Sequence, residues 1–182
     1  MTYYGSKELA ESFRTVRQNT ITVAEDIPED KYSFKPAAEL RSVEKMLTHI
    51  ALASRFQYQV QAVEKRVSME GFNFPVLMQQ LMAEEARPRT KAEVIELLKT
   101  EGEKWGSFLA GVSDDFLGQT ITMPPGGAPP SRTRFDMILS VKEHEMHHRA
   151  QLMLIERMLG ITPHLTKQMQ ERMARMQQMQ QK

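Results

Sequence analysis

The sequence predicts an all-α protein, and three observations identify the fold as a four-helix bundle. Apolar residues recur at spacings of three and four in four long segments, capping residues mark several helix ends, and two longer connections join the segments. The chain has 182 residues, of which 41% are hydrophobic and 26% charged, which suits one domain with a buried core. We expect this domain to cover residues 1–165 and a Gln- and Met-rich tail to cover 166–182.

The first helix is predicted from Ser6 to about Ala24, where apolar residues line one side. Ser6 is expected as the N-cap, because its hydroxyl can accept a bond from an unpaired backbone amide. Pro28 cannot continue a helix, so a connector over Glu29–Leu40 follows.

The second helix is predicted over Ser42–Ser68, with an inner face that reaches Val63 and Val67. His49 lies on this apolar face. A single histidine on such a face is more often a core residue than a ligand. His49 therefore becomes a candidate metal ligand only if another part of the chain supplies partners for it.

The segment Met69–Pro88 breaks the long-helix pattern with prolines and a glycine. We interpret it as a crossover with a short helix in Val76–Ala86 that packs over one end of the bundle. This crossover either frames a site or serves packing alone. Thr90 and Glu93 then form a capping box that starts the third helix, which extends to about Gly111.

The next connection, Ser113–Ser131, contains four prolines and three glycines, so we expect no helix in it. Gln119–Met123 has the composition of a brief strand. The fourth helix is predicted over about Arg132–Leu159, with Gly160 as its left-handed cap. His164 lies just outside this helix and is expected on the surface.

Methionine recurs at helical spacing in the tail, which favours an adaptable contact stripe over a cofactor site. The methionines concerned are Met169, Met173, Met176 and Met179. Such a stripe would serve self-association or a neighbouring molecule. A frayed chain end is the alternative interpretation.

Composition excludes several classes of protein. The chain has no cysteine, so it forms no disulfide, and any metal must be held by nitrogen and oxygen. Its net charge of +1 shows no basic excess of the kind that nucleic-acid binding needs, so we expect no nucleic-acid partner. Met1–Ala10 does not resemble a signal peptide, and no apolar run is long enough for a membrane span. We therefore expect a cytoplasmic protein that does not bind membranes.

The strongest chemical signal is Lys142–Gln151 (KEHEMHHRAQ), which holds three of the five histidines. His144 and His148 are four residues apart and share one helix face, a common way to supply two imidazoles to one metal ion. The apolar stripe of this helix consists of Ile138, Val141, Leu152, Ile155 and Leu159. At roughly 100° per residue, His148 lies near the stripe's middle, His144 within about 60° of it and His147 well over 100° away. The favoured pair is therefore His144 and His148.

A four-helix bundle brings side chains from facing helices to a common axis, so His49 can complete a three-nitrogen site with this pair. Three protein ligands leave an ion open to water or substrate, as in catalytic sites. Each histidine should also donate its second ring N–H to an outer partner. The candidate partners are Glu101, Glu145 and Gln151. Glu145 lies about 40° from the stripe centre and is also the candidate catalytic residue, as a proton shuttle. The commoner explanation for such a residue is a charged side chain at the edge of the helix with no catalytic role.

Two segments resemble the DinB/YfiT-like family. Ile27–Ala51 (IPEDKYSFKPAAELRSVEKMLTHIA) is similar to the start of the family's second helix, and His144–Leu165 (HEMHHRAQLMLIERMLGITPHL) is similar to its closing helix. The resemblance covers about residues 6–165. One departure is Ala150, where many members have glycine, and it should affect packing more than ligation.

The resemblance implies an up-down-down-up bundle, frequently dimeric, that binds a divalent ion such as zinc or nickel. The family's metal ligands fall on His49, His144 and His148, the same residues that the stripe geometry favours. We therefore expect a metal-binding protein that forms a homodimer.

Characterised members of the family include thiol-dependent transferases and a mycothiol-dependent maleylpyruvate isomerase. The leading hypothesis is therefore a metal-dependent transferase that uses a small-molecule substrate and a low-molecular-weight thiol, whose pKa the ion would lower. The lack of cysteine is compatible, because the cosubstrate supplies the nucleophile. The alternatives are a metal-dependent hydrolase and a non-enzymatic metal-binding module for stress response or dimerisation.

Overall fold

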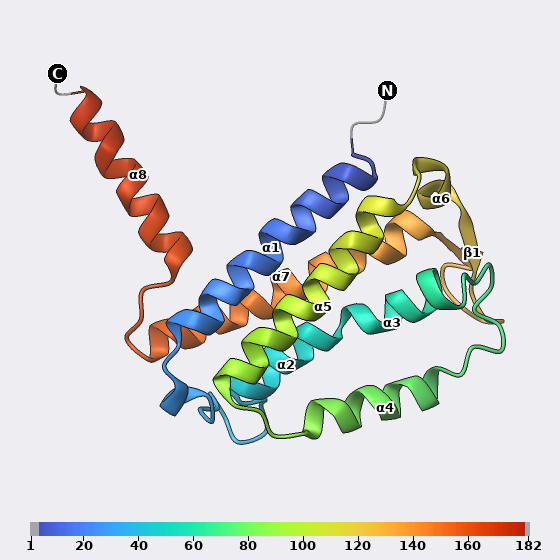
Figure 1. Cartoon of the computed structure of the whole chain (residues 1–182), viewed down its shortest axis with the longest axis horizontal. Coiled ribbons are helices and arrows are strands. Elements are labelled where there is room, and N and C mark those ends of the chain that lie inside the picture. Colours follow the sequence, from blue (N-terminus) through green and yellow to red (C-terminus); the bar gives the residue numbers. More distant parts are fainter. Residues whose placement is uncertain (1–3, 181–182) are drawn as a thin grey trace.

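The computed structural model describes residues 4–180 and confirms an all-α four-helix bundle (Figure 1). Its long elements are α1 (Ser6–Asp26), the interrupted segment that begins with α2 (Val43–Leu52), α5 (Lys91–Gly111) and α7 (Arg134–Met158). In Figure 1, α1 and α7 run in one direction, whereas α2 and α5 run in the opposite direction. This is the up-down-down-up order that the family resemblance implies. Residues 1–3 of the predicted domain and 181–182 of the predicted tail lie outside the described part of the chain.

The core is formed by the inward faces of these four segments. Its large, fully buried side chains include Phe13, Leu47, Ile50, Leu98, Trp105, Leu109, Ile138 and Leu152. The capping box of Thr90 and Glu93 at the start of α5 is confirmed. At α1 the predicted cap was wrong by one residue: Gly5 is the N-cap, and its N–H donates to the Glu8 carboxylate.

The second helical segment is broken, unlike the continuous helix that the periodicity predicts. Ser42 caps α2, and α3 (Ser54–Tyr58) and the single π-turn η2 (Gln59–Val63) continue its direction. The prediction of helix up to Ser68 was wrong, and Val63 and Val67 are exposed rather than inward. The chain leaves the helix because residues 67–69 pair with a strand instead, with Met69 N–H donating to the Thr122 carbonyl.

That strand belongs to a small hairpin between α5 and α7. β1 (Thr120–Thr122) pairs antiparallel with β2 (Ser131–Thr133), which confirms the brief strand expected at Gln119–Met123. The expectation that Ser113–Ser131 contains no helix was wrong, because α6 (Asp114–Gly118) forms one short turn before the prolines begin. Ser113 accepts a bond from the Phe116 amide and so starts this turn.

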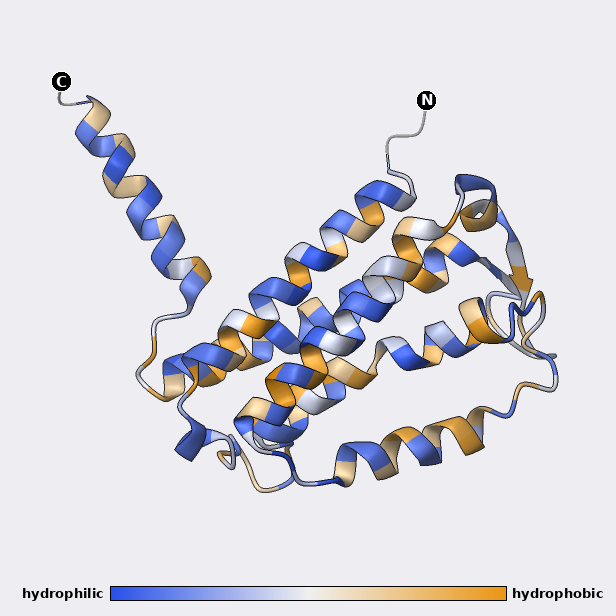
Figure 2. Ribbon diagram, in the orientation of Figure 1, coloured by the Kyte–Doolittle hydropathy of each residue, from blue (hydrophilic) through white to orange (hydrophobic). Residues whose placement is uncertain are grey.

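The crossover between the second and third helical segments contains α4 (Phe74–Ala86), close to the short helix expected at Val76–Ala86. Asn73 caps it, and none of its residues is buried. It runs alongside α2 and α3 on the outside of the bundle, so the expectation that it packs over one end was wrong (Figure 1). Figure 2 shows several hydrophobic residues along α4 despite this position.

α8 (His164–Gln180) follows α7 and extends away from the bundle (Figure 1). Gly160 has a φ of +77° and ends α7 as the expected left-handed cap. The prediction that His164 lies on the surface was wrong, because it is 7% exposed where α8 meets the bundle and pairs with Asn19. The four tail methionines are exposed along α8. Within residues 4–180, no helix combines the length and apolar character needed to cross a bilayer.

Candidate metal centre

Three histidines from two facing helices converge beside the bundle core. His49 comes from α2, and His144 and His148 come from successive turns of α7. The Nε2 atom of His144 lies 3.1 Å from Nε2 of His49 and 3.1 Å from Nε2 of His148. All three side chains are half-buried, and one nitrogen of each lies within 4.8 Å of the others. The structure thus brings together the three histidines singled out from the sequence.

Two of these rings are held by outer acceptors. His49 Nδ1 donates to Glu85 Oε2 at 2.8 Å, and His148 Nδ1 donates to Gln151 Oε1 at 2.8 Å. An ionised carboxylate accepts only, so the Nδ1 of His49 carries the proton. The side-chain oxygen of Gln151 fixes the same tautomer at His148. In neutral imidazoles, both Nε2 atoms therefore present lone pairs towards His144.

This donor set fits a divalent cation. The Nε2 of His144 can carry at most one proton, so it cannot donate full hydrogen bonds to both neighbours. Its buried Nδ1 has no partner within residues 4–180. A tetrahedral ion with Zn–N bonds of about 2.05 Å would separate its ligand nitrogens by about 3.3 Å. The observed 3.1 Å separations are close to this spacing. Imidazole nitrogen is also a ligand that zinc, nickel and copper accept.

The site keeps His144 and His148 neutral near pH 7. Burial, reinforced by the neighbouring histidines, lowers the pKa of His144 to about 4. Burial likewise lowers the pKa of His148, although the bond to Gln151 opposes the change. Burial alone would raise the pKa of Glu85, but hydrogen bonds from His49 and Arg41 hold it at about 2. Neutral imidazoles beside a charged carboxylate are the protonation states that metal ligation requires.

The three residues proposed from the sequence as outer hydrogen-bond partners of the histidines occupy different positions in the structure. Gln151 contacts His148 as described. Glu101 on α5 pairs instead with Arg55 at 2.7 Å. Glu145 is fully buried and pairs with Arg17 at 2.9 Å, and it lines neither of the two pockets beside the histidines. His147 is exposed and lies 3.3 Å from the Gln151 side chain, outside the three-histidine cluster.

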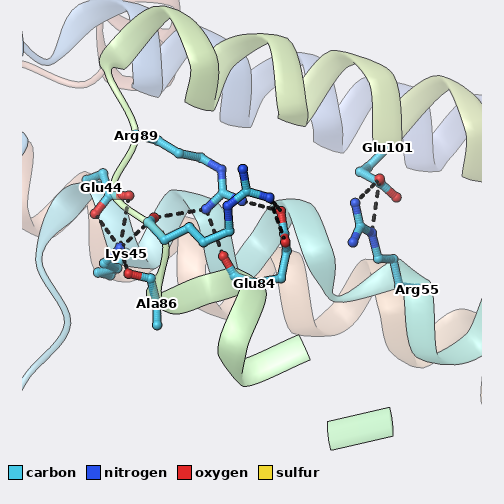
Figure 3. A network of polar contacts seen from close by, with 8 residues as sticks. Glu44, Lys45, Arg55, Glu84, Ala86, Arg89 and Glu101 are labelled. Atoms are coloured by element: carbon cyan, nitrogen blue, oxygen red, sulfur yellow. Dashed lines mark hydrogen bonds and ion pairs between the residues drawn. The ribbon is translucent and has the colours of Figure 1, made fainter. Parts of the chain in front are cut away.

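Sequence reasoning missed Glu85, the acceptor for His49. Glu85 lies on α4, and a sequence pattern that predicts this helix does not say how it docks on the bundle. Figure 3 shows the contacts at this end of α4: Lys45 of α2 reaches the carbonyl of Ala86, and Arg89, in the connection that follows α4, binds Glu84. The Lys45 bond holds the C-terminal end of α4 against α2, where Glu85 lies beside His49.

A pocket of about 530 Å³, here called the α4 pocket, lies between α4 and the bundle. Its volume is in the range of small-molecule sites. Its apolar lining consists of Leu52, Ala53, Phe56, Phe74, Met78, Leu81, Met82 and Val141. Its polar lining consists of Arg41, His49, Gln57, Glu85, Arg132, Ser140 and His144.

A second pocket of about 550 Å³, here called the α7 pocket, lies on the other side of the cluster. His148 and Gln151 line it together with apolar residues of α7 and of the connector before α2. Arg41 lines both pockets. The three histidines therefore stand where two small-molecule-sized pockets meet.

The fold and this cluster define a four-helix-bundle protein with a candidate three-histidine metal centre. The chain belongs to the DinB superfamily, whose family model matches residues 12–152. The DinB/YfiT-like resemblance seen in the sequence is thereby confirmed.

Relatives with solved structures share the whole bundle. The uncharacterized protein YjoA of Bacillus subtilis (strain 168) is 28% identical over 157 residues, or 86% of this chain and 92% of YjoA. Its crystal structure superposes with a TM-score of 0.62 at 24% identity and covers 85% of this chain and 94% of that one.

Two further solved structures share the fold of this chain at lower sequence identity. YfiT from Bacillus subtilis, described as a probable metal-dependent hydrolase with an unusual four-helix bundle topology, gives a TM-score of 0.65 at 13% identity, with 89% of this chain and 91% of YfiT covered. A putative DinB-family member from Exiguobacterium sibiricum gives a TM-score of 0.60 at 17% identity, with 88% of this chain and 94% of that chain covered. At these identities the likeness shows the fold.

Proposed function

We propose that this protein is a divalent-metal-dependent enzyme that acts on a small molecule held beside His49, His144 and His148. The observation that carries the proposal is the convergence of the three Nε2 atoms beside the α4 pocket, which His49 and His144 line. A structural metal site takes four protein ligands, whereas three ligands beside a pocket match the pattern of a catalytic site.

The residues have distinct roles in this proposal. The three histidines hold the ion, and zinc or nickel suits an all-imidazole ligand set. Glu85 and Gln151 fix the rings of His49 and His148 by accepting their Nδ1 protons. A bound divalent ion would lower the pKa of a coordinated thiol or water.

Transfer to a low-molecular-weight thiol is the reaction that this geometry favours. Glu85 is the carboxylate that lines the α4 pocket, and both its oxygens are already engaged, by His49 and Arg41. A thiol that loses its proton to water needs no protein base. Its sulfur would bond to an electrophilic carbon while the leaving group departs with its electron pair. The two pockets offer room for two organic reactants.

Hydrolysis is the second candidate, and the observation that favours it is the structural likeness to YfiT, which is described as a probable metal-dependent hydrolase. Water would then replace the thiol as the nucleophile. A non-enzymatic metal-binding or dimerisation module is the third candidate. It would need no pocket beside the histidines, so the α4 pocket makes it the weakest of the three.

Activity assays on metal-loaded protein distinguish the candidates. The transferase proposal predicts that 1-chloro-2,4-dinitrobenzene is consumed only when a thiol such as cysteine or glutathione is added, and that His148→Ala abolishes this activity but His147→Ala does not. Thiol-independent cleavage of p-nitrophenyl acetate with the same dependence on the variants would instead establish the hydrolase. If metal-loaded protein shows neither activity across broad substrate panels, the binding module becomes the preferred account.

The homodimer implied by the family resemblance is part of the proposal. Sedimentation equilibrium tests it directly. The proposal predicts a mass twice the 21.0 kDa of one chain, and a mass of one chain at micromolar concentration would contradict it.

A further inference from the structure

The α4 pocket is elongated, with the histidines at one end. Glu85, near the C-terminus of α4, contacts His49, whereas Phe74 at the other end of α4 packs on Phe56 with ring centroids 5.7 Å apart. About eleven helical residues separate Phe74 from Glu85, and at about 1.5 Å per residue the pocket wall is roughly 16 Å long. Arg132 also lines the pocket, just before α7, whose His144 follows some three turns later. Arg132 and the histidine cluster thus mark opposite ends.

The wall between these ends is apolar and weakly packed. α4 contributes Phe74, Met78, Leu81 and Met82 to the lining, yet none of its residues is buried. Phe74 is 49% exposed and Met82 is 65% exposed. Methionine side chains adapt to the shape of what they contact. An elongated apolar ligand would cover this face and remove its side chains from water.

The charged residues of the lining favour an anionic group at the Arg132 end. Arg132 donates through Nε to Asp136, which does not line the pocket. Among residues 4–180, the two terminal nitrogens of Arg132 have no hydrogen-bond partner. At the other end the charge of Arg41 is offset within the pocket by Glu85. The lining thus contains two arginines and one carboxylate, and Arg132 is the arginine whose partner, Asp136, lies outside it. The free terminal nitrogens of this guanidinium are well suited to bind a carboxylate.

We infer that the α4 pocket binds a linear apolar carboxylic acid, with the carboxylate on Arg132 and the opposite end of the chain at the three histidines. Arg132 is then a specificity-determining residue. The inference rests on the proposed function only in taking this pocket as the substrate site. Binding of the acid itself does not require a bound metal, because the group that recognises it lies at the far end from the histidines.

Isothermal titration of the purified protein with octanoate and with 1-octanol tests this inference. The two probes share the apolar chain and differ in charge. Wild type should bind octanoate about tenfold or more tightly than 1-octanol, in line with a charge-assisted hydrogen bond. Arg132→Gln should lose this preference and keep its affinity for 1-octanol. Arg132→Lys, which retains the charge, should keep part of the preference.

Two control variants make the outcome specific. Arg87→Gln replaces an exposed arginine at the C-terminal end of α4 that does not line the pocket, and it should bind both probes like wild type. His148→Ala should still bind octanoate even if it no longer holds metal, so failure of the metal proposal is distinguishable from failure of this one. Equal affinity of wild type for the two probes would overturn the inference. So would octanoate binding that survives Arg132→Gln but is lost in His148→Ala, because the carboxylate would then lie at the metal.

Discussion

Arg17 and Glu145 form a buried, two-pronged ion pair in the middle of the bundle, with Nε 2.9 Å from Oε1 and Nη2 2.9 Å from Oε2. The remaining Arg17 donors reach the carbonyls of Leu98 at 2.8 Å and Ile50 at 3.4 Å. One guanidinium of α1 thus links α2, α5 and α7. Ile50 follows His49 and Glu145 follows His144 in the chain, so this link fixes the backbone directly behind two of the three histidines.

Loss of one partner from this pair should destabilise the protein strongly. Glu145→Gln would leave the Arg17 charge buried without its counterion, and breaking a buried pair in this way costs about 3–5 kcal/mol. Urea unfolding measures the change. Lys7→Ala, which removes an exposed 4.0 Å pair with Glu11, is the control and should change stability by less than about 0.5 kcal/mol. Normal stability of Glu145→Gln with lost activity would instead support the catalytic role considered from the sequence.

Glu85 should contribute to metal affinity without touching the metal. Glu85→Gln weakens the acceptor that orients His49, and loss of such an outer partner typically lowers affinity about 10–100-fold. Competition with a chromophoric chelator gives the affinity. Glu84→Gln is a matched control on the same turn of α4, because Glu84 pairs with Arg87 and Arg89 rather than a histidine. Equal metal affinities of the two variants would show that Glu85 does not support metal binding.

The buried Glu156 should make stability depend on pH. Both its oxygens are buried, and neither has a hydrogen-bond partner in the described part of the chain. Burial, aided by Asp26 and opposed by Lys167 and Arg157, raises its pKa to about 7 from 4.5. The folded state thus holds this proton more tightly than the unfolded state, so the stabilisation is complete below pH 4.5 and is lost as pH rises to 7.

Glu156→Gln removes this titration. Its stability relative to wild type should therefore rise by roughly 2–3 kcal/mol between pH 4.5 and pH 8. Chemical denaturation at several pH values gives the difference, with Glu171→Gln on the exposed part of α8 as control. A constant difference across this range would show that folding does not change the pKa of Glu156.

The exposed part of α8 should be dispensable for folding. Residues 167–180 are all exposed, whereas His164 packs on the bundle. A chain ending at Thr166 should keep its free energy of unfolding within about 0.5 kcal/mol, as is usual for surface changes. This result would support the domain boundary expected near residue 165. A large loss of stability, or loss of a dimer, would show that the Met-rich face of α8 has a partner.

Periodic patterns in the sequence were sufficient to predict the helical bundle and to select the histidines of the cluster. Helical spacing identified α1, α5 and α7, and the angular position of His148 in its apolar stripe separated it from His147. These are local properties of one helix, so the sequence contains them directly.

What the sequence could not provide depends on contacts between distant segments. The second helix stops at Val63 because residues 67–69 pair with β1. Glu85 reaches His49 only through the docking of α4 on α2. His164 is buried because the chain turns back on the bundle after Gly160. No local pattern shows these contacts.

The central claim is that His49, His144 and His148 hold one divalent ion. Metal content should be measured by mass spectrometry on protein purified without a metal-affinity step. The proposal predicts about one ion per chain in wild type and in His147→Ala, and none in His49→Ala, His144→Ala or His148→Ala. Wild-type protein that holds no metal and cannot be loaded with zinc or nickel would contradict it.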